Sequence, residues 1–229
     1  MHSTNFTLVI VMALQSLKFA TCFFIPSFCN RYFYSMYKTI GLFLVLAFFS
    51  CKKEDELPLT EDEVLAEFLN LPTNPFNYAN PPLPAHLLQS QSLNIDNTPA
   101  HNLVTDDGAT LGRVLFYDKN LSKNGTIACA SCHKQEFAFE DPNSFSEGYE
   151  GYFTKRHSMS IINAKYYEEG KFFWDERAAT LEDQVLMPIQ DSVEMGMTLA
   201  EMLVRIKSRP FYPILFERAF NSEEITTEK

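Results

Sequence analysis

Five consecutive residues, Cys129-Ala130-Ser131-Cys132-His133, constrain this chain more than any other feature. Two thiols stand three positions apart and a histidine follows the second, which is the C-x-x-C-H arrangement of covalent c-type haem attachment. The two sulfurs can form thioethers with the two vinyl groups of one haem, and the adjacent imidazole can then bind the iron. The motif therefore predicts a covalently bound c-type haem on Cys129 and Cys132, with His133 as the proximal iron ligand.

Two other uses of the paired thiols were weighed. A zinc ribbon needs a second pair of ligands, and the remaining cysteines (Cys22, Cys29 and Cys51) all lie in an apolar leader. A thioredoxin-type dithiol does not need the histidine and would follow a strand in a βαβ unit, which the sequence does not show. Haem attachment is favoured, and zinc and a redox dithiol are kept as alternatives.

The charge of the chain is unevenly distributed. Residues 1–51 contain three basic residues and no Asp or Glu, so residues 52–229 hold 16 of the 19 Lys and Arg and all 29 Asp and Glu, a net charge of −13. Such an acidic body argues against nucleic acid as a partner, because the phosphate backbone attracts cations. It would suit a basic redox protein, although a solvated acidic surface explains the composition equally simply.

The first 51 residues read as a leader. Of two apolar stretches, 6–20 and 40–49, the second follows a methionine and a lysine and has the length of a signal-peptide core, too short to span a bilayer comfortably. A small residue directly before Cys51 resembles the end of a bacterial lipobox. We expect a true start at Met36 and a lipid anchor on Cys51; a single long membrane anchor is the alternative. Either reading exports the body to the periplasm or the outer-membrane side of the cell envelope.

Residues 52–104 are predicted to be a charged tether followed by an irregular wrap. Thr60 and Glu63 form a capping-box pattern, which predicts one short helix near 61–70. Proline is frequent over 71–100, which favours an extended path there.

Residues 105–229 are predicted to be helical, and the fold class is all-α because no strand-period run exceeds a few residues. Gly112 suggests a close crossing by another helix. Pro188 is expected to end a helix. The predicted helix starts are Thr105, Thr180, Thr198, Ser208 or Pro210, and Thr226 or Thr227.

From Gly112 onward the chain resembles the bacterial di-haem cytochrome c peroxidases, including their relatives that oxidise protein tryptophans. The resemblance implies a cytochrome-c-like helical haem domain, with peroxide reduced at this N-terminal haem and electrons supplied by a second haem in a C-terminal half. Residues 105–229 would then be the N-terminal peroxidatic domain, and a second C-x-x-C-H is expected beyond Lys229. The residues that carry the resemblance are Leu111–Asp118, Asn124–His133, Phe172–Gln184, Pro188-Ile189 and Glu194–Gly196.

The resemblance implies three roles by position. Glu194 matches the distal carboxylate that moves a proton between the two peroxide oxygens, a task for a general acid–base. Gln184 matches an amide that hydrogen-bonds in the same pocket. Trp174 matches an indole that relays electrons between the haems. With Pro188 expected to break any shared helix, the three can meet only through tertiary folding. Without the family match, Trp174 would read as core and Glu194 as a surface acid.

Two neighbouring positions differ in how well they fit the family. Arg156 matches a basic residue that could bind a haem propionate. The next family residue is often Asn, associated with an inter-domain calcium, and here it is His157, which argues against calcium. Residues 134–155 contain no histidine, so the haem should be open to peroxide without reductive activation. His157 is read as having a propionate or backbone partner, with iron ligation as the alternative.

The resulting functional expectation is a haem peroxidase that reduces hydrogen peroxide to water with electrons from a small redox protein such as cytochrome c; a homodimer is compatible with the resemblance. One alternative is a mono-haem electron-transfer cytochrome with Met187 or Met195 as the second iron ligand. Another is a di-haem oxidase that modifies a protein substrate.

Overall fold

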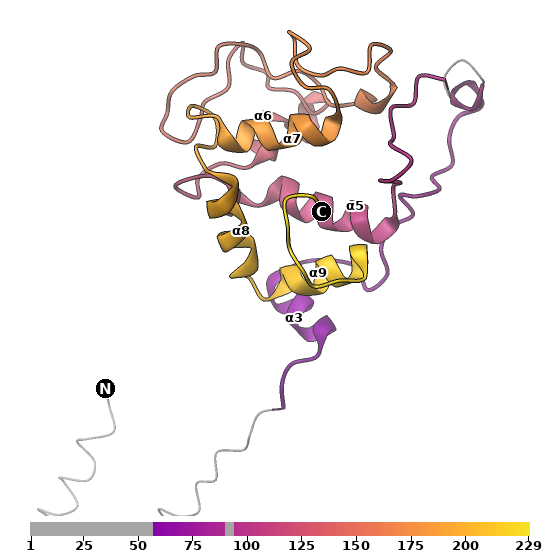
Figure 1. Cartoon of the computed structure of the whole chain (residues 1–229), viewed down its shortest axis with the longest axis vertical. Helices are drawn as coiled ribbons and strands as arrows, with labels where there is room; N and C mark the ends of the chain where they lie inside the picture. Colours follow the sequence, from indigo (N-terminus) through magenta and orange to yellow (C-terminus); the bar gives the residue numbers. More distant parts are fainter. Residues whose placement is uncertain (1–56, 90–93) are drawn as a thin grey trace, which may run out of the picture. The chain divides into compact units, whose positions relative to one another are not determined.

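The computed structural model describes residues 57–89 and 94–229, so the leader, the start at Met36 and the lipid on Cys51 lie outside the described residues. Apart from three isolated bridges the described residues contain no strand, which confirms the all-α prediction. None of their helices combines the length and apolar content needed to cross a bilayer. The helices are α3 (Glu61–Phe68), α5 (Asp106–Tyr117), α6 (Cys129–Cys132), α7 (Leu181–Gln190), α8 (Leu199–Lys207) and α9 (Phe211–Phe220), with short 3-10 turns η1 (Ala85–Leu88), η2 (Lys119–Leu121), η3 (Gln135–Phe137) and η4 (Ala164–Tyr166) (Figure 1).

Four helices begin where their threonine caps predict. The hydroxyls of Thr60, Thr105, Thr180 and Thr198 each accept a hydrogen bond from the backbone N–H three residues on. These bonds satisfy donors that the first helical turn leaves without a partner. In α3 and α8 a glutamate returns the bond to the cap, so both capping boxes form.

The expectation that Pro188 ends its helix is wrong, because α7 continues through it to Gln190. Pro188 has no N–H, so only the main-chain carbonyl of Gln184 loses its intrahelical donor. The loss falls in the last turn, where the backbone folds back: Asp191 N donates to Met187 O and Met197 N donates to Ile189 O. Gln184 and Pro188 therefore share one helix, and Glu194 follows it by four residues.

One smaller expectation also differs from the structure, and another is not tested by it. A Cβ built on Gly112 would meet no atom within 4 Å, so no described residue crosses α5 closely there. Residues 222–229 are not helical and Ile225 packs into the core, while the helix start expected at Thr226 or Thr227 stays a prediction because only two or three residues follow it here.

The core lies mainly between α5 and α9, with α8 and α3 closing its sides (Figure 1). Tyr212 is fully buried, and its hydroxyl donates to Asp118 Oδ2 at 2.8 Å, which ties α9 to the end of α5. This bond satisfies a polar group that burial would otherwise penalise. The buried residues of the core are Leu65, Leu111, Leu121, Ile189, Met195, Met197, Met202, Ile206, Phe211, Tyr212, Leu215, Phe216 and Ile225.

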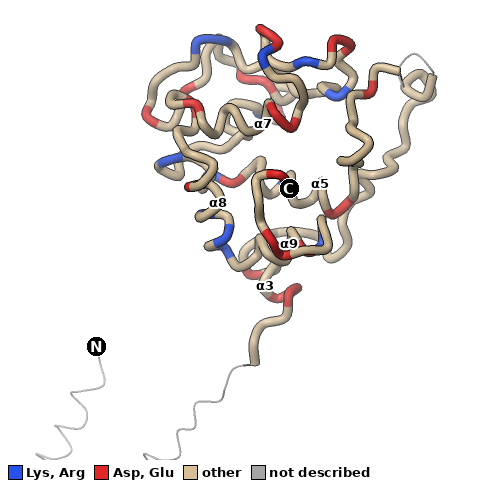
Figure 2. Tube along the Cα trace, viewed as in Figure 1, with Lys and Arg blue, Asp and Glu red and all other residues tan. Residues whose placement is uncertain are grey.

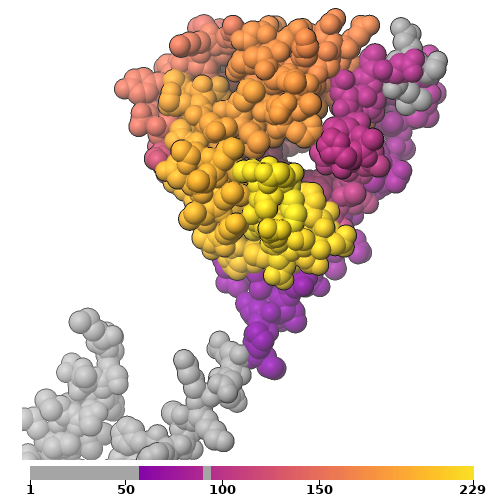
Figure 3. All heavy atoms as spheres, viewed as in Figure 1, coloured from indigo at the N-terminus to yellow at the C-terminus, as the bar shows by residue number. Residues whose placement is uncertain are grey.

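Helix α3 packs against α9 although the two are far apart in sequence. The rings of Phe68 and Phe211 lie 5.9 Å apart, and Arg218 pairs with Asp62 at 2.9 Å and Glu61 at 3.4 Å. In the space-filling view the purple α3 segment lies directly against the yellow C-terminal residues (Figure 3). Residues near both ends of the described chain thus share one interface.

The extended wrap is fastened at two points. Asp106 Oδ1 accepts hydrogen bonds from the backbone N–H groups of Tyr78 and Ala79, both at 2.7 Å. Further along, Asp96 pairs with Lys165 at 3.0 Å and Asn97 N donates to the Lys165 carbonyl. Apart from η1, the described part of 71–100 has no helix, as the proline content predicts.

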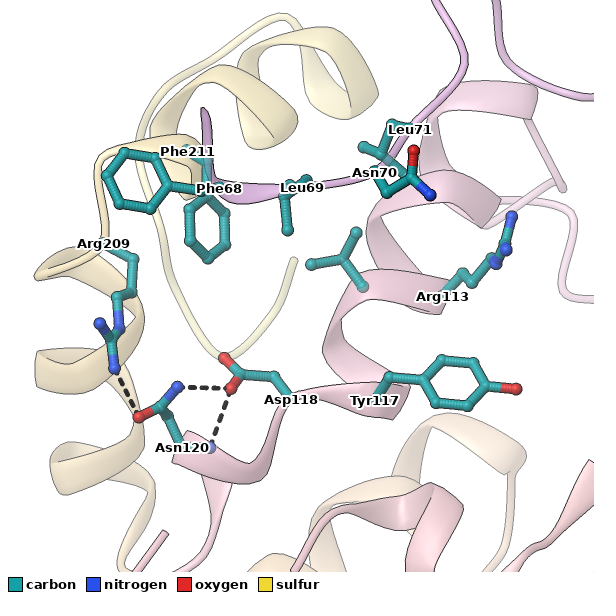
Figure 4. A pocket seen from close by; sticks show the side chains of 11 residues that line it. Phe68, Leu69, Asn70, Leu71, Arg113, Tyr117, Asp118, Asn120, Arg209 and Phe211 are labelled. Carbon is teal, nitrogen blue, oxygen red and sulfur yellow. Dashed lines mark hydrogen bonds between the residues drawn. The ribbon is translucent and has the colours of Figure 1, made fainter. Parts of the chain in front are cut away.

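A cavity of about 420 Å³ lies where α3 gives way to the wrap, beside α5, η2 and the start of α9 (Figure 4). Its wall includes Phe68, Arg113 and Phe211. Arg209 donates to Asn120 Oδ1 at its edge, and Asn120 in turn donates to Asp118. No lining residue belongs to the C-x-x-C-H motif or to the expected distal group, so this cavity is separate from the candidate site.

Candidate haem-binding site

The backbone leading into the C-x-x-C-H motif is held by α8 and by the turn that follows α7. Arg205 donates to the carbonyls of Asn120 at 3.0 Å and of Ser122 and Lys123 at 2.6 Å. Lys123 N donates to Met195 O at 2.8 Å. The Arg205 guanidinium is planar and rigid, so its bonds to three carbonyls fix the path of the backbone that enters the motif.

Helix α6 is a single turn that presents Cys129 and Cys132 on one side. Both thiols are half-buried. Burial is the main cause that raises the pKa of Cys129 to about 11, with the charges of Cys132 and Glu194 adding to it. Burial likewise raises the pKa of Cys132, opposed by a hydrogen bond with Ser146. A reactive dithiol needs a lowered thiol pKa, so these environments disfavour the redox alternative.

His133 is oriented by a loop that follows it. Its Nδ1 lies 3.0 Å from the carbonyl oxygen of Phe139. With the proton on Nδ1 as donor, Nε2 carries the free lone pair that an iron ligand requires. Burial lowers the pKa of His133, while hydrogen bonds to the backbone of Phe139 and Met159 act in the opposite direction. A neutral imidazole is the ligating form, so both features suit a proximal ligand.

Three loops, each closed by one antiparallel bridge, surround the motif along residues 134–178. The bridges join Lys134 to Glu140, Glu147 to Phe153, and Phe172 to Ala178. The first loop orients His133, the second contacts the turn that holds Glu194, and the third carries Trp174. Basic and acidic residues are interspersed along this part of the trace rather than gathered on one element (Figure 2).

A buried polar network lies beside Cys132 and His133. Asp141, only 3% exposed, pairs with Lys134 at 3.0 Å and accepts from Ser146 Oγ at 2.8 Å. The Ser146 hydroxyl also lies 2.7 Å from Ser158 Oγ. The pKa of Asp141 is lowered by these hydrogen bonds, although burial opposes them as the largest single effect. The network joins Lys134, Asp141, Ser146 and Ser158, which belong to different parts of the chain after the motif. The sequence alone did not predict it.

Glu194 stands on a tight turn that the second loop contacts. Tyr149 N donates to Glu194 O at 3.0 Å. A Cβ built on Gly148 would come within 1.7 Å of Val193 O, so only glycine lets the loop approach this closely. Gly196 has φ +69° and lies against the ring of Tyr149, where a side chain would be strained as well as blocked. These contacts confine the path of the turn on either side of Glu194.

Glu194 is partly buried, and its pKa is shifted by its surroundings. Burial raises its pKa, the charge of Asp191 raises it further, and Arg177 opposes both. Its own charge raises the pKa of Cys129 and Cys132, which places the carboxyl within electrostatic range of the two sulfurs. Glu194 therefore interacts electrostatically with both cysteines of the motif.

Trp174 and two arginines form the outer edge of the site. The Trp174 indole is 59% exposed, and its Nε1 donates to the carbonyl of His157 at 2.9 Å. Arg177 stacks 3.6 Å from the centre of the Phe173 ring. Asp175 pairs with Arg177 at 2.8 Å and with Arg156 at 2.9 Å.

The remaining residues expected at the site have the following surroundings. Arg156, expected at a haem propionate, is paired with Asp175 and half-exposed. His157 Nδ1 lies 3.1 Å from the carbonyl oxygen of Asn143. Gln184 is half-buried on α7, with its backbone N–H bonded to Thr180. Of the two methionines in the electron-carrier alternative, Met187 is half-buried on α7 and Met195 is 4% exposed within the core.

The donor set fits a c-type haem. Two thiols share one helical turn, the following imidazole has its Nδ1 engaged, and a carboxyl of raised pKa lies close by. Among residues 57–89 and 94–229 no three His, Cys, Asp or Glu side chains are grouped to hold a bare metal ion. The residues that would hold the haem are therefore Cys129, Cys132 and His133.

A protein-family model described as di-haem cytochrome c peroxidase matches residues 106–229. The chain belongs to this family. The family binds c-type haem covalently, which agrees with the motif and with the geometry around α6. Its members are oxidoreductases, and they include both peroxidases and MauG proteins.

Relatives of both kinds are similar to the chain. A methylamine utilization protein MauG from Methylophilus methylotrophus is 33% identical over 131 residues, covering 57% of this chain and 38% of the relative. A cytochrome c551 peroxidase from Nitrosomonas europaea is 34% identical over 125 residues, covering 54% and 36%. The crystal structure of a MauG-like protein associated with microbial copper homeostasis aligns with a TM-score of 0.53 and 34% identity, covering 64% of this chain and 40% of that one.

The chain thus spans between a third and two fifths of the length of these relatives. The region that matches includes α5 to α9 with the three loops, which is the part that carries the haem motif and Glu194.

Proposed function

We propose that residues 105–229 form the peroxidatic haem domain of an enzyme that reduces hydrogen peroxide to water. The observation that carries the proposal is the position of Glu194, a partly buried carboxyl of raised pKa within electrostatic range of both haem-attaching thiols. Carboxyls with such shifts next to a cofactor motif are typical of general acid–base groups. The reaction consumes one peroxide, two electrons and two protons and yields two waters.

In this proposal the attached haem would supply the iron centre for peroxide reduction, and the electrons would come from an external donor. Glu194 would accept a proton from one peroxide oxygen and return it to the other, which leaves as water. A carboxyl whose pKa lies above its usual range can perform both steps closer to neutral pH. Gln184, on the preceding helix, orients the peroxide by hydrogen bonding. The charge of Arg177 favours the ionised form of Glu194, so that it can act as a base.

Electrons are proposed to enter through Trp174, whose exposed indole is held at one end by the His157 carbonyl. The donor is a small reduced redox protein such as cytochrome c, or a second haem in a further domain. Export to the periplasm, with anchoring through Cys51, belongs to the same proposal because covalent haem attachment takes place outside the cytoplasm.

A protein-modifying oxidase is the second candidate, because similarity to known proteins does not distinguish it from a peroxidase. The chain is as similar to MauG relatives, at 33–35% identity, as to the cytochrome c551 peroxidase at 34%. Trp174 would then draw electrons from a protein substrate rather than from a donor cytochrome. Both candidates use the same site, and they differ in the source of the electrons.

Replacing Glu194 by Gln tests the peroxidase proposal. The amide keeps the shape and removes the basicity, so peroxide turnover with an artificial electron donor should fall by about 10²–10⁴-fold. Gln184→Ala, measured alongside, should cost less because Gln184 only orients. Both variants should retain haem. Wild-type turnover in a haem-loaded Glu194→Gln protein would exclude the assigned role, and a rate that depends on neither residue would favour the electron-carrier alternative.

The haem ligands are tested separately. In the Cys129→Ala, Cys132→Ala double variant, acid–acetone extraction of the denatured protein should remove all haem, since no thioether remains. His133→Gly should keep the covalent haem but lose the absorption spectrum of a histidine-ligated iron. Haem that stays with the chain after extraction from the double variant would show that the attachment site is wrong.

A further inference from the structure

Asp191 occupies an unusual place for an acid. It is the C-cap of α7, where the partial negative charge of the helix end disfavours a carboxylate. A carboxylate at a helix C-terminus is locally unfavourable, and natural proteins keep such residues mainly at functional sites, where other interactions offset the cost. The hydrogen bonds that Asp191 accepts are the interactions that can offset this cost.

Asp191 fixes the turn that carries Glu194 through its side chain, its carbonyl and its backbone N–H. Its Oδ1 accepts from Val193 N at 2.8 Å and from Glu194 N at 3.1 Å. Its carbonyl accepts from Gly196 N at 2.8 Å, and its own N–H closes α7 on Met187 O. Two of these bonds use the side chain, and they hold the backbone N–H groups of Val193 and of Glu194 itself.

We propose that Asp191 is a positioning residue for Glu194: its carboxylate fixes the backbone from which the distal side chain projects and sets a negative charge beside it. The proposal rests on the proposed function only for its catalytic meaning. The positioning itself concerns two residues of one turn and can be measured without peroxide.

The charges that face Glu194 come from three elements. Asp191, on the same turn, opposes ionisation of Glu194, and Arg177 from the third loop favours it. Cys129 and Cys132 from α6 also lie in range, but as thioethers of a haem-loaded chain they carry no titrating proton. Burial raises the pKa of Glu194 and Asp191 raises it further, so removing the Asp191 charge should move the titration of Glu194 to lower pH.

The two contributions can be separated by substitution. Asp191→Asn keeps an oxygen that can accept from Val193 N and Glu194 N while removing the charge. Asp191→Ala removes both. Asp183→Asn makes the same chemical change on an exposed position of the same helix and serves as the matched control.

Two measurements on the haem-loaded chain then decide. The carbonyl stretch of the protonated Glu194 carboxyl is followed by infrared spectroscopy against pH and assigned by its loss in Glu194→Gln. Its midpoint should move to lower pH in Asp191→Asn and stay in place in Asp183→Asn. Amide hydrogen exchange over residues 192–196 should be about tenfold faster in Asp191→Ala, which loses two hydrogen bonds, and unchanged in Asp191→Asn.

An unmoved Glu194 midpoint in Asp191→Asn, or unchanged exchange in Asp191→Ala, would overturn the proposal. Failure of the peroxidase assignment looks different: Glu194→Gln would keep full turnover while the infrared midpoint still responded to Asp191→Asn.

Discussion

At the residue scale, Glu194 is placed where its charge is unfavourable. Burial and the neighbouring Asp191 raise its pKa above the value it has in an unfolded chain. A carboxyl of this kind binds a proton more tightly in the folded state. Its contribution to stability is complete below its unfolded pKa and is lost as the pH rises through its folded pKa. The ionised Glu194 that the proposed catalysis requires therefore makes the folded state less stable.

Glu194→Gln should accordingly raise the thermal unfolding temperature at pH 8, because a neutral amide has no desolvated charge. The gain should vanish near pH 4, where the glutamate is itself protonated. Unfolding curves of both proteins at the two pH values, followed by circular dichroism, test this. A Glu194→Gln protein no more stable than the wild type at pH 8 would contradict the assigned burial effect.

At the element scale, helix starts were predictable and helix continuation was not. Thr60, Thr105, Thr180 and Thr198 cap by bonds to residues three positions away, so their effect is written locally in the sequence. The continuation of α7 through Pro188 depends on bonds from residues 191–197 that fold back on its last carbonyls. A local reading cannot foresee that support.

Two glycines of α5 offer a matched pair. Gly112→Ala should raise the free energy of unfolding of this chain by about 0.5–1 kcal/mol, since alanine favours a helix and the new Cβ meets nothing within 4 Å. Gly108→Ala should not show this gain, because its Cβ would lie 2.8 Å from the Thr105 hydroxyl that caps the helix. Urea unfolding of both variants provides the comparison. Equal gains would show that the cap adjusts without cost.

The site was predictable only in part, for a related reason. Cys129, Cys132 and His133 are adjacent in sequence, and Glu194 followed from resemblance. Asp141 and Tyr149 act through hydrogen bonds to partners that no sequence pattern marks. Asp191 did leave a local signal, since an aspartate whose side chain accepts from the N–H two residues on is a common turn former.

At the scale of the whole molecule, the acidic body depends on ionised carboxylates. Hydrogen bonds and paired cations lower the pKa of several acids, and for Glu201, which bonds to Lys123 and Thr198, to about 2. A group with a lowered pKa stabilises the fold above its unfolded pKa, near 4.5 for glutamate, and this stabilisation is lost as the pH falls toward the folded value. The acids with lowered pKa values are Glu63, Asp96, Asp141, Asp175, Glu201 and Glu228.

The free energy of unfolding should therefore fall as the pH is lowered from about 4.5 toward 2. Denaturant titrations at pH 6, 4 and 3 measure this dependence. Glu201→Gln should show a shallower fall, because one of the contributing groups is gone. A stability that does not change over this range would mean that these pairs are not maintained in solution.

The contact of α3 with α9 has a consequence for the order of folding. Arg218 and Glu61 lie 157 positions apart, so their pairing closes a loop that contains the haem motif and most of the described chain. Closing so long a loop has a high entropic cost until the intervening contacts exist. In the proposed exported protein α3 would cross the membrane before α9, so the two could pack only after α5, α6 and the three loops had followed. The thiols of α6 are thus available for haem attachment before the two ends of the domain meet.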